Sequence, residues 1–395
     1  MRHHEASWGG DAWTCRHLDV CTSLMLLSVP GGEYQSTTRR IARIGKADVM
    51  AATSAARRNT TGVRQAKIGF VLSHEQFPAA ELIEYGVAAE KAGFDMIWCS
   101  DHFQPWQDNE GHASLAWLTI SALGQRTSRL LMGTGVTCPS FRYSPSIVAQ
   151  AFASLGVLYP GRVFLGVGAG EAVNEMAAAD QWGDYRERAS RLTEAVDLIR
   201  QLWTGERLDF TGRYYRTNQA RLYEIPDHPV PIYIAGSGPK SMKLAGAQGD
   251  GLITDTKRAL QQELRQAFAE GASAAGKDAG TMPILAEHMV VLGDENDAKS
   301  GAQLWRFMPK SWELYVDDPN PVSIQQRAER DVPLQSVYAD WPVSPDPGAH
   351  IAALQKLVDG GISHIFVHSP QLDQRRIIRF YGEQVLPKIA RAVRR

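Results

Sequence analysis

Cysteine is scarce in this chain, and the common metal-binding motifs are missing. The 395 residues include four cysteines, Cys15, Cys21, Cys99 and Cys138, without CxxC spacing. A disulfide scaffold needs a higher density of cysteines and a structural zinc site needs closely paired ligands, so we expect neither. The sequence also has no HExxH, EF-hand or Walker A motif and no GxSxG elbow. It therefore does not match the corresponding hydrolase and NTPase classes.

The chain also lacks an excess of either charge and any long apolar run. Its formal net charge is -1, so the charge balance does not indicate binding to nucleic acid or to a membrane surface. No run of about 18 apolar residues occurs, and we predict no membrane-spanning helix. With 44% hydrophobic and 22% charged residues, the composition is that of an enzyme with a large core.

Residues 1–65 differ from the rest of the sequence. They mix polar and basic residues with one short apolar run and show no lasting periodicity, so we predict a disordered N-terminal extension followed by one domain over residues 66–395. Arg39 and Arg40 form a twin arginine that suggests an export leader. Arg43, Lys46 and Asp48 interrupt the apolar segment that such a leader needs, which favours a cytoplasmic protein over an exported one.

From Lys67 onward, short apolar runs alternate with amphipathic segments, a pattern that predicts alternating strands and helices. The predicted strands are 67–72, 94–99, 129–134, 162–167, 230–235, 251–254, 284–292 and 364–367. The predicted helices are 79–92, 114–125, 145–158, 185–203, 240–248, 260–275, 350–359 and 374–392. Two segments, 205–229 and 297–343, interrupt the alternation without a predicted element.

Eight strands and about eight helices fit a (β/α)8 TIM barrel with insertions, although a doubly wound open sheet has a similar count. Polar residues follow nearly every predicted strand. This favours the barrel, in which such residues form a ring, over the open sheet, in which they gather at one switch point of the strand order. The ring comprises Ser73, His74, Glu75, Asp101, His102, Thr137, Gly170, Glu171, Ser237, Asp255, Glu287, His288 and His368.

The strand ending at Cys99 is followed by Asp101, His102 and, after an aromatic-proline turn, Trp106. An acid, an imidazole and an indole at the carboxyl end of a barrel strand are suitable for proton transfer at the mouth of a pocket. The same residues are also compatible with a helix cap, a surface histidine and a packing residue.

Glycines follow three other strands. Gly166, Gly168 and Gly170 do not have the spacing or position of a dinucleotide fingerprint, so we expect them to let a flat ring lie close to the backbone. Gly133 and Gly135 suggest a second place where a flat ring could lie against the backbone, or else a tight turn where the strand ends. Residues 234–239 end a strand before a helix and predict free amides for a phosphate, or an ordinary helix start. This inventory favours hydride transfer to a flat organic cofactor.

Longer strings of residues resemble the coenzyme F420-dependent dehydrogenases of the bacterial luciferase-like superfamily. The strings are Asp101 to Trp106, Arg142-Tyr143, Ala149 to Ala153, Tyr159 to Gly168 and Asp373 to Arg376, and the likeness extends from about Ala66 to the end. The resemblance implies a TIM-barrel oxidoreductase acting on CH-OH donors. It also implies coenzyme F420, an 8-hydroxy-5-deazaflavin, as the hydride acceptor.

The resemblance also implies roles for individual residues. His102 would be the base that removes the proton of the substrate hydroxyl, and Asp101 would lie against the cofactor and orient it. Trp106 would support the developing charge, Glu171 would supply a proton to the reduced ring, and Glu75 would be a further acidic group of the pocket.

Further positions match residues that contact the cofactor in the family. Gly135-Val136 falls where relatives have a non-prolyl cis peptide behind the ring. The other matching cofactor-binding positions are Gly170, Asn174, Ala235, Gly236, Ser237 and Gly238.

Two branches of the family differ in substrate, one oxidising glucose 6-phosphate and the other hydroxymycolic acid. Val71 to Phe77, Trp106 to His112 and Pro319 to Val322 resemble the second branch more closely. Where sugar-phosphate enzymes have an arginine before a tryptophan, this chain has Asp340-Trp341, and an aspartate repels a phosphate dianion. Lys257, Arg258 and Arg327 are the cations available to replace part of that arginine's role, and glucose 6-phosphate is the alternative substrate.

We therefore expect a secondary alcohol without phosphate as the substrate, either a lipid like hydroxymycolic acid or another non-phosphorylated alcohol. A flavin monooxygenase and a coenzyme-binding protein without turnover are the other interpretations that the sequence leaves open. The family resemblance implies a homodimer, and no partner other than a small alcohol is expected.

Overall fold

The computed structural model describes residues 64–393, which form a closed barrel of eight parallel strands. The strands are β2 (Lys67–Leu72), β3 (Met96–Cys99), β4 (Leu131–Thr134), β5 (Val163–Val167), β6 (Ile232–Ala235), β7 (Gly251–Asp255), β8 (Ile284–Met289) and β9 (His364–His368). Each strand pairs with the next along the chain, and β2 pairs with β9 to close the ring. The predicted barrel is thus confirmed, and the doubly wound sheet is excluded.

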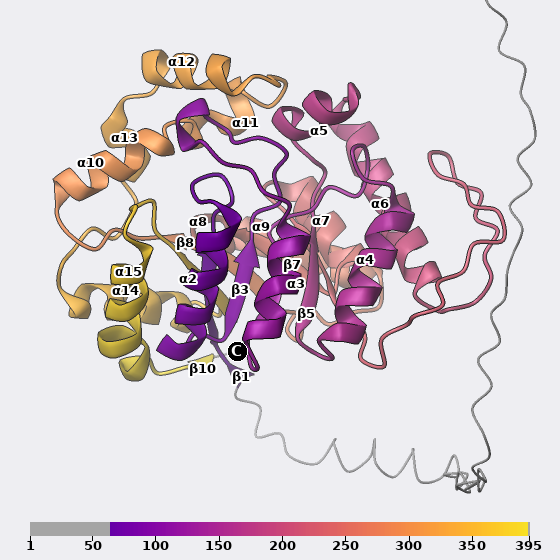
Figure 1. The fold of residues 1–395 in the computed structure, drawn as a ribbon, viewed down its shortest axis with the longest axis horizontal. Coiled ribbons are helices and arrows are strands. Elements are labelled where there is room, and N and C mark those ends of the chain that lie inside the picture. Colours follow the sequence, from indigo (N-terminus) through magenta and orange to yellow (C-terminus); the bar gives the residue numbers. More distant parts are fainter. Residues whose placement is uncertain (1–63, 394–395) are drawn as a thin grey trace, which may run out of the picture. The chain divides into compact units, whose positions relative to one another are not determined.

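Helices follow the strands and surround the barrel (Figure 1). They are α2 (Ala79–Ala92), α3 (Ala116–Arg126), α4 (Pro145–Leu158), α5 (Ala172–Ala179), α6 (Tyr185–Leu202), α7 (Pro239–Gln248), α8 (Thr256–Ala259), α9 (Gln262–Ala274), α14 (Pro347–Asp359) and α15 (Gln374–Phe380). Proline occupies the first position of α4, α7 and α14, where its missing N–H is not needed and its fixed φ suits a helix start.

The barrel interior is filled by side chains from alternate positions of the strands, because successive residues of a strand point to opposite faces. This inner cluster consists of Val71, Met96, Trp98, Phe164, Ile253, Leu285 and Phe366. A larger apolar cluster lies between the outer faces of the strands and the helices. The two layers hold the barrel strands in register.

The segment between β8 and α14, for which the sequence predicted no element, contains helices α10 (Glu295–Leu304), α11 (Ser311–Leu314), α12 (Pro321–Asp331) and α13 (Leu334–Tyr338). Their apolar residues form a separate cluster that includes Trp305, Phe307, Tyr315 and Ile324 and also takes in Trp106 and Val173. In Figure 1 these orange helices lie at the same end of the barrel as α5. We call residues 295–343 the β8–α14 insertion.

The predicted terminal helix 374–392 is wrong beyond Phe380. The helix loosens into a π-helical turn at Tyr381–Val385 and a 3-10 turn at Leu386–Lys388, because Pro387 has no N–H to continue a helix. The chain then forms β10 (Ala392–Val393), which pairs antiparallel with β1 (Arg64–Gln65). Both short strands were missed, as was α5. The other predicted elements lie within a few residues of the observed ones.

The predicted extension over residues 1–65 lies almost wholly outside the described residues. Within residues 64–393, no helix is both long and apolar enough to cross a bilayer.

Gly166 in β5 offers a test of how closely the strands approach. A Cβ at this position would collide with the carbonyl oxygen of Thr134 in β4. We expect Gly166→Ala to lower the free energy of unfolding by about 2 kcal/mol, because the backbone of a packed strand cannot move aside. Chemical denaturation measures the change. Gly280→Ala, at an exposed loop position, is the matched control and should change it by less than about 0.5 kcal/mol. Equal effects of the two substitutions would contradict the close approach.

Candidate active site

A cavity of about 470 Å³ opens at the carboxyl ends of the strands, the usual place for the active site of a barrel enzyme. Most of the predicted polar ring lines it, namely Glu75, Asp101, His102, Gly170, Glu171, Ser237, Asp255, Glu287 and His368. Ser73, His74, Thr137 and His288 do not. His74 is buried against Thr119, and burial next to His350 lowers the pKa of His288 to about 4.

His102 lies between two carboxylates. Its Nε2 is 3.1 Å from Glu75 Oε1 and 3.6 Å from Glu171 Oε2. Glu75 is buried, and its other oxygen accepts hydrogen bonds from Ser73 Oγ (3.0 Å) and Ser100 Oγ (2.5 Å). These bonds fix the orientation of the carboxylate that faces the imidazole.

The environments of the two carboxylates shift their pKa values in opposite directions. Burial works to raise the pKa of Glu75, but the neighbouring His102 and the hydrogen bond from Ser100 outweigh it and hold that pKa below its usual value. Desolvation in the cavity wall raises the pKa of Glu171 above its usual value despite His102. One imidazole therefore faces a group that favours the ionised form and another that favours the protonated form, a frequent arrangement in acid–base catalysis.

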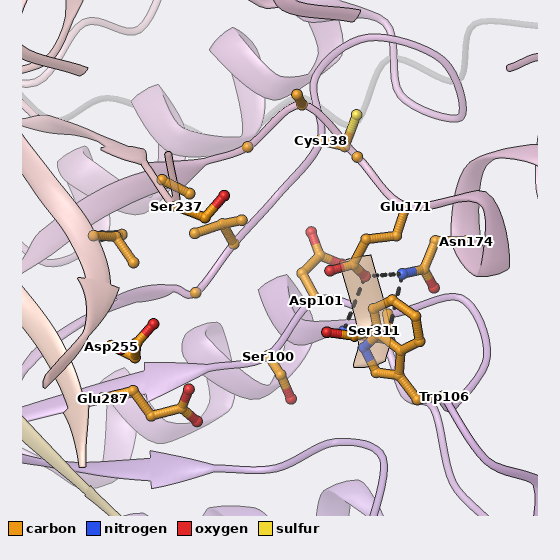
Figure 2. A pocket seen from close by; sticks show the side chains of 18 of the residues that line it. Ser100, Asp101, Trp106, Cys138, Glu171, Asn174, Ser237, Asp255, Glu287 and Ser311 are labelled. Carbon is orange, nitrogen blue, oxygen red and sulfur yellow. Dashed lines mark hydrogen bonds and ion pairs between the residues drawn. The ribbon is translucent and has the colours of Figure 1, made fainter. Parts of the chain in front are cut away.

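Asn174, on α5, contacts both the imidazole and Glu171, and Figure 2 shows it next to Glu171. Its Oδ1 accepts a hydrogen bond from the backbone N–H of Phe103 (2.8 Å), so its Nδ2 is the atom 3.1 Å from His102 Nδ1. An amide nitrogen can only donate, whereas the Gln104 carbonyl oxygen, 3.3 Å from the same Nδ1, can only accept. Each tautomer of the neutral imidazole therefore has a partner at Nδ1, and with Nδ1 donating to Gln104 O the lone pair of Nε2 is free to accept a proton.

Asp101 does not contact the imidazole that follows it. Its carboxylate accepts hydrogen bonds from Thr137 Oγ1 (2.5 Å) and Tyr143 Oη (3.1 Å), and Arg142 Nη2 lies 3.3 Å away. Arg142 also bonds to Glu175, with 3.1 Å between Nε and Oε1. This buried set of charges fixes the loop after β3 and places Asp101 in the cavity wall.

One wall of the cavity is made of backbone. The peptide bond between Gly135 and Val136 is cis, as the family resemblance implies. A Cβ on Gly168 would lie 2.7 Å from Val136 Cγ2, and Gly170 has a φ of +85° and would meet Cys138 Sγ at 2.8 Å. Side chains at these positions would therefore crowd the wall. Its flatness fits a planar ring resting against it.

The turn after β6 is less open than predicted. The amides of Gly236, Ser237 and Gly238 are not free: Gly236 donates to Ile253 O, and the other two donate to Ser241 Oγ. Ala235, Gly236 and Ser237 line the cavity with Ser241, whereas Gly238 does not. An anion at this helix start would have to displace the Ser241 hydroxyl.

The β8–α14 insertion supplies part of the cavity that sequence reasoning missed. Trp305, Phe307, Met308 and Ser311 line it, and Phe307 stacks on Trp106 with ring centroids 4.8 Å apart. The only sequence signal was aromatic residues within a long interruption. Arg142 and Glu175 also line the cavity and were not predicted as site residues.

The structure does not place Asp340 where it could repel a phosphate group of the substrate. Asp340 is exposed, forms a salt bridge of 2.8 Å with Lys257, and is not part of the cavity wall. Of the cations proposed as replacements, Arg258 lines the cavity but is paired with Asp255, and Arg327 is paired with Asp318. Any discrimination against phosphate must come from other residues.

The closed barrel with an acid–imidazole cavity at its strand ends places the chain among barrel enzymes. It belongs to the luciferase-like monooxygenase family, whose model matches residues 52–360. The chain is 52% identical over 322 residues to the F420-dependent hydroxymycolic acid dehydrogenase of Mycobacterium tuberculosis, covering 82% of this chain and 88% of the relative. It is 41% identical to the F420-dependent glucose-6-phosphate dehydrogenase of Nakamurella multipartita, covering 82% and 96%.

Among solved structures, the chain is similar to an F420-dependent secondary alcohol dehydrogenase in complex with an F420-acetone adduct. The TM-score is 0.77 at 32% identity, and the match covers 81% of this chain and 98% of that one.

Arg142 tests how strongly the buried charges depend on one another. We expect Arg142→Met to lower the free energy of unfolding by about 3 to 5 kcal/mol, because Asp101 and Glu175 would remain buried without their cation. Chemical denaturation measures this loss. Lys257→Met breaks the exposed pair with Asp340 and, as the control, should change stability by at most about 1 kcal/mol. A small effect of Arg142→Met would mean that the two carboxylates are stabilised by other groups.

Proposed function

We propose that the chain is a coenzyme F420-dependent dehydrogenase that transfers a hydride from a secondary alcohol to the deazaflavin ring. The observation that carries the proposal is His102, which lies between carboxylates with opposite pKa shifts in a cavity with a flat backbone wall. The similarity to F420-dependent dehydrogenases supports the choice of cofactor and donor.

The chemistry of the residues that line the cavity fits coenzyme F420. Gly135, Val136, Gly168 and Gly170 form the wall against which a planar ring would rest, and Ala235, Gly236 and Ser237 would contact its substituents. When bound, coenzyme F420 supplies a two-electron acceptor for hydride. Asp101 and Asn174 would lie beside it, each held by hydrogen bonds to neighbouring residues.

His102 and Glu75 would act together as the proton acceptor. The substrate hydroxyl must lose a proton as hydride leaves the carbon that bears it. Glu75 is held in its ionised form, and His102 Nε2 lies 3.1 Å from it, so positive charge gained by the imidazole is stabilised across that contact. Asn174 keeps the ring from rotating.

Glu171 would be the proton donor toward the cofactor. Its raised pKa favours the protonated form, and Asn174 Nδ2 fixes its Oε2 at 3.0 Å. Trp106, stacked on Phe307, would exclude water from the reacting atoms.

Removal of the imidazole tests the base. His102→Ala should lower kcat by about 10²- to 10⁴-fold, the usual contribution of a general base, while coenzyme binding is retained. Loss of the oxidised coenzyme's absorbance measures turnover, and fluorescence titration measures binding. His228→Ala, at an exposed histidine of the insert after α6, is the control and should behave as the wild type. Unimpaired turnover in His102→Ala would rule out His102 as the base.

A substrate panel tests the reaction itself. Reduction of the coenzyme by secondary alcohols and lipid alcohols, with little by glucose 6-phosphate, is the expected result. The 41% identity to a glucose-6-phosphate dehydrogenase favours that sugar phosphate as the second candidate, and reduction by it alone would establish that alternative. Tight coenzyme binding without reduction by any donor would indicate a binding protein.

Assembly and location are further proposals. Exposed leucines on the surface helices, Leu118 on α3 and Leu158 on α4, support a homodimer, which light scattering of the purified chain tests.

Export would depend on Arg39 and Arg40, which lie outside the described residues. Cell fractionation of the full chain and of a variant with both arginines replaced by lysine tests it, and we propose that both remain in the cytoplasm.

A further inference from the structure

A second acid–imidazole pair lines the same cavity, away from His102. Glu287 Oε1 at the end of β8 lies 2.6 Å from His368 Nδ1 at the end of β9. Both residues continue the inward-facing rows of their strands, two positions beyond Leu285 and Phe366 of the barrel interior. In Figure 2, Glu287 and Asp255 lie on one side of the cavity, and Glu171, Asn174 and Trp106 lie on the other. The mechanism above does not use this pair.

Among residues 64–393, two buried nitrogen atoms in this part of the cavity wall have no hydrogen-bond partner. They are His368 Nε2 and Trp305 Nε1, from residues that are 2% and 7% exposed and that both line the cavity. The two rings meet edge to face, with centroids 4.7 Å apart. Because nearly all buried polar atoms in folded proteins are hydrogen-bonded, two such atoms on residues that line one cavity are candidates to bind a polar group there.

The chemistry of the two atoms selects the ligand. The indole N–H can only donate. His368 Nδ1 faces the Glu287 carboxylate, which favours a proton on Nδ1 and leaves Nε2 as an acceptor in the neutral ring. A hydroxyl group satisfies both, since its oxygen accepts from the indole and its proton is donated to the imidazole. A phosphate cannot donate when ionised, and the Glu287 carboxylate would repel it.

We propose that Glu287, His368 and Trp305 form a subsite that binds a second, uncharged hydroxyl group of the alcohol substrate. We call it the second-hydroxyl subsite. The inference rests on the proposed function, because it takes the oxidised alcohol to lie beside His102. The substrate class is then a secondary alcohol with a further hydroxyl, whose carbon chain packs on apolar side chains such as Phe307 and Met308. The subsite also gives a reason for discrimination against phosphate that does not depend on Asp340.

Binding without coenzyme is the first test. In protein labelled with ¹⁵N-tryptophan, the Trp305 indole N–H signal should shift saturably with 1,3-butanediol or 1,5-hexanediol. It should shift little with 2-butanol or 2-hexanol, which have a single hydroxyl. Trp305→Phe assigns the signal. The indole of Trp203, which donates to Ala149 O, provides an internal control that should not move.

Diols that leave the Trp305 signal unchanged would overturn the subsite. So would a shift caused by inorganic phosphate or by the single alcohols to the same extent, because the site would then not select a second neutral hydroxyl.

Substrate preference in the loaded enzyme is the second test. The ratio of kcat/KM for each diol to that for the matching single alcohol should fall about tenfold in Trp305→Phe and in His368→Gln, the loss expected for one buried hydrogen bond. Thermal unfolding of both variants checks that they fold. An equal loss for diols and single alcohols would show a purely structural role and overturn the proposal.

The two tests separate the inference from the function beneath it. A saturable shift of the Trp305 signal without hydride transfer from any alcohol would support the subsite and refute the dehydrogenase. Hydride transfer without diol preference and without a shift of the Trp305 signal would support the dehydrogenase and refute the second-hydroxyl subsite.

Discussion

The site depends on the burial of an imidazole against a carboxylate that stays ionised. Burial alone would raise the pKa of Glu75, because taking a charge out of water is costly. His102 at 3.1 Å and the hydroxyls of Ser73 and Ser100 offset that cost. These partners come from the loops after β2 and β3, which are adjacent strands of the barrel. The pairing of β2 with β3 therefore holds Glu75 and His102 together.

The arrangement of the other acidic residues also reflects the cost of burying a charge. Burial raises the pKa of Glu171, and the nearby charge of Glu75 adds to that shift. Asp101 is kept apart from His102 by Arg142, Tyr143 and Thr137, which take up its oxygens. Asp101 thus lines the same cavity as Glu75 and Glu171 without sharing their partner His102. The arrangement leaves only Glu75 and Glu171 facing the imidazole.

The sequence predicted the barrel strands and most helices well, because their periodicity is local and each strand ends at a polar residue. The residues after β2, β3 and β5 that face the cavity were also predicted, through Glu75, His102 and Glu171. The predictions that failed concern features that depend on contacts between residues distant in sequence. The strand β10 forms only because β1 is available to pair with it, and no pattern within residues 374–392 indicates that partner. Polar residues at strand ends cannot be assigned to the inner or the outer face without the register, so His74 and His288 were placed in the ring.

The cavity is assembled from two separately encoded parts. The wall that fits a flat cofactor belongs to β4, β5 and β6, whereas Trp305, Phe307, Met308 and Ser311 belong to a single stretch between β8 and α14. That stretch packs largely within its own apolar cluster. Evolution can therefore exchange or remodel it with little disturbance to the barrel. Substitutions within this one segment would then change which molecule fits the cavity while the backbone wall after β4, β5 and β6 is kept.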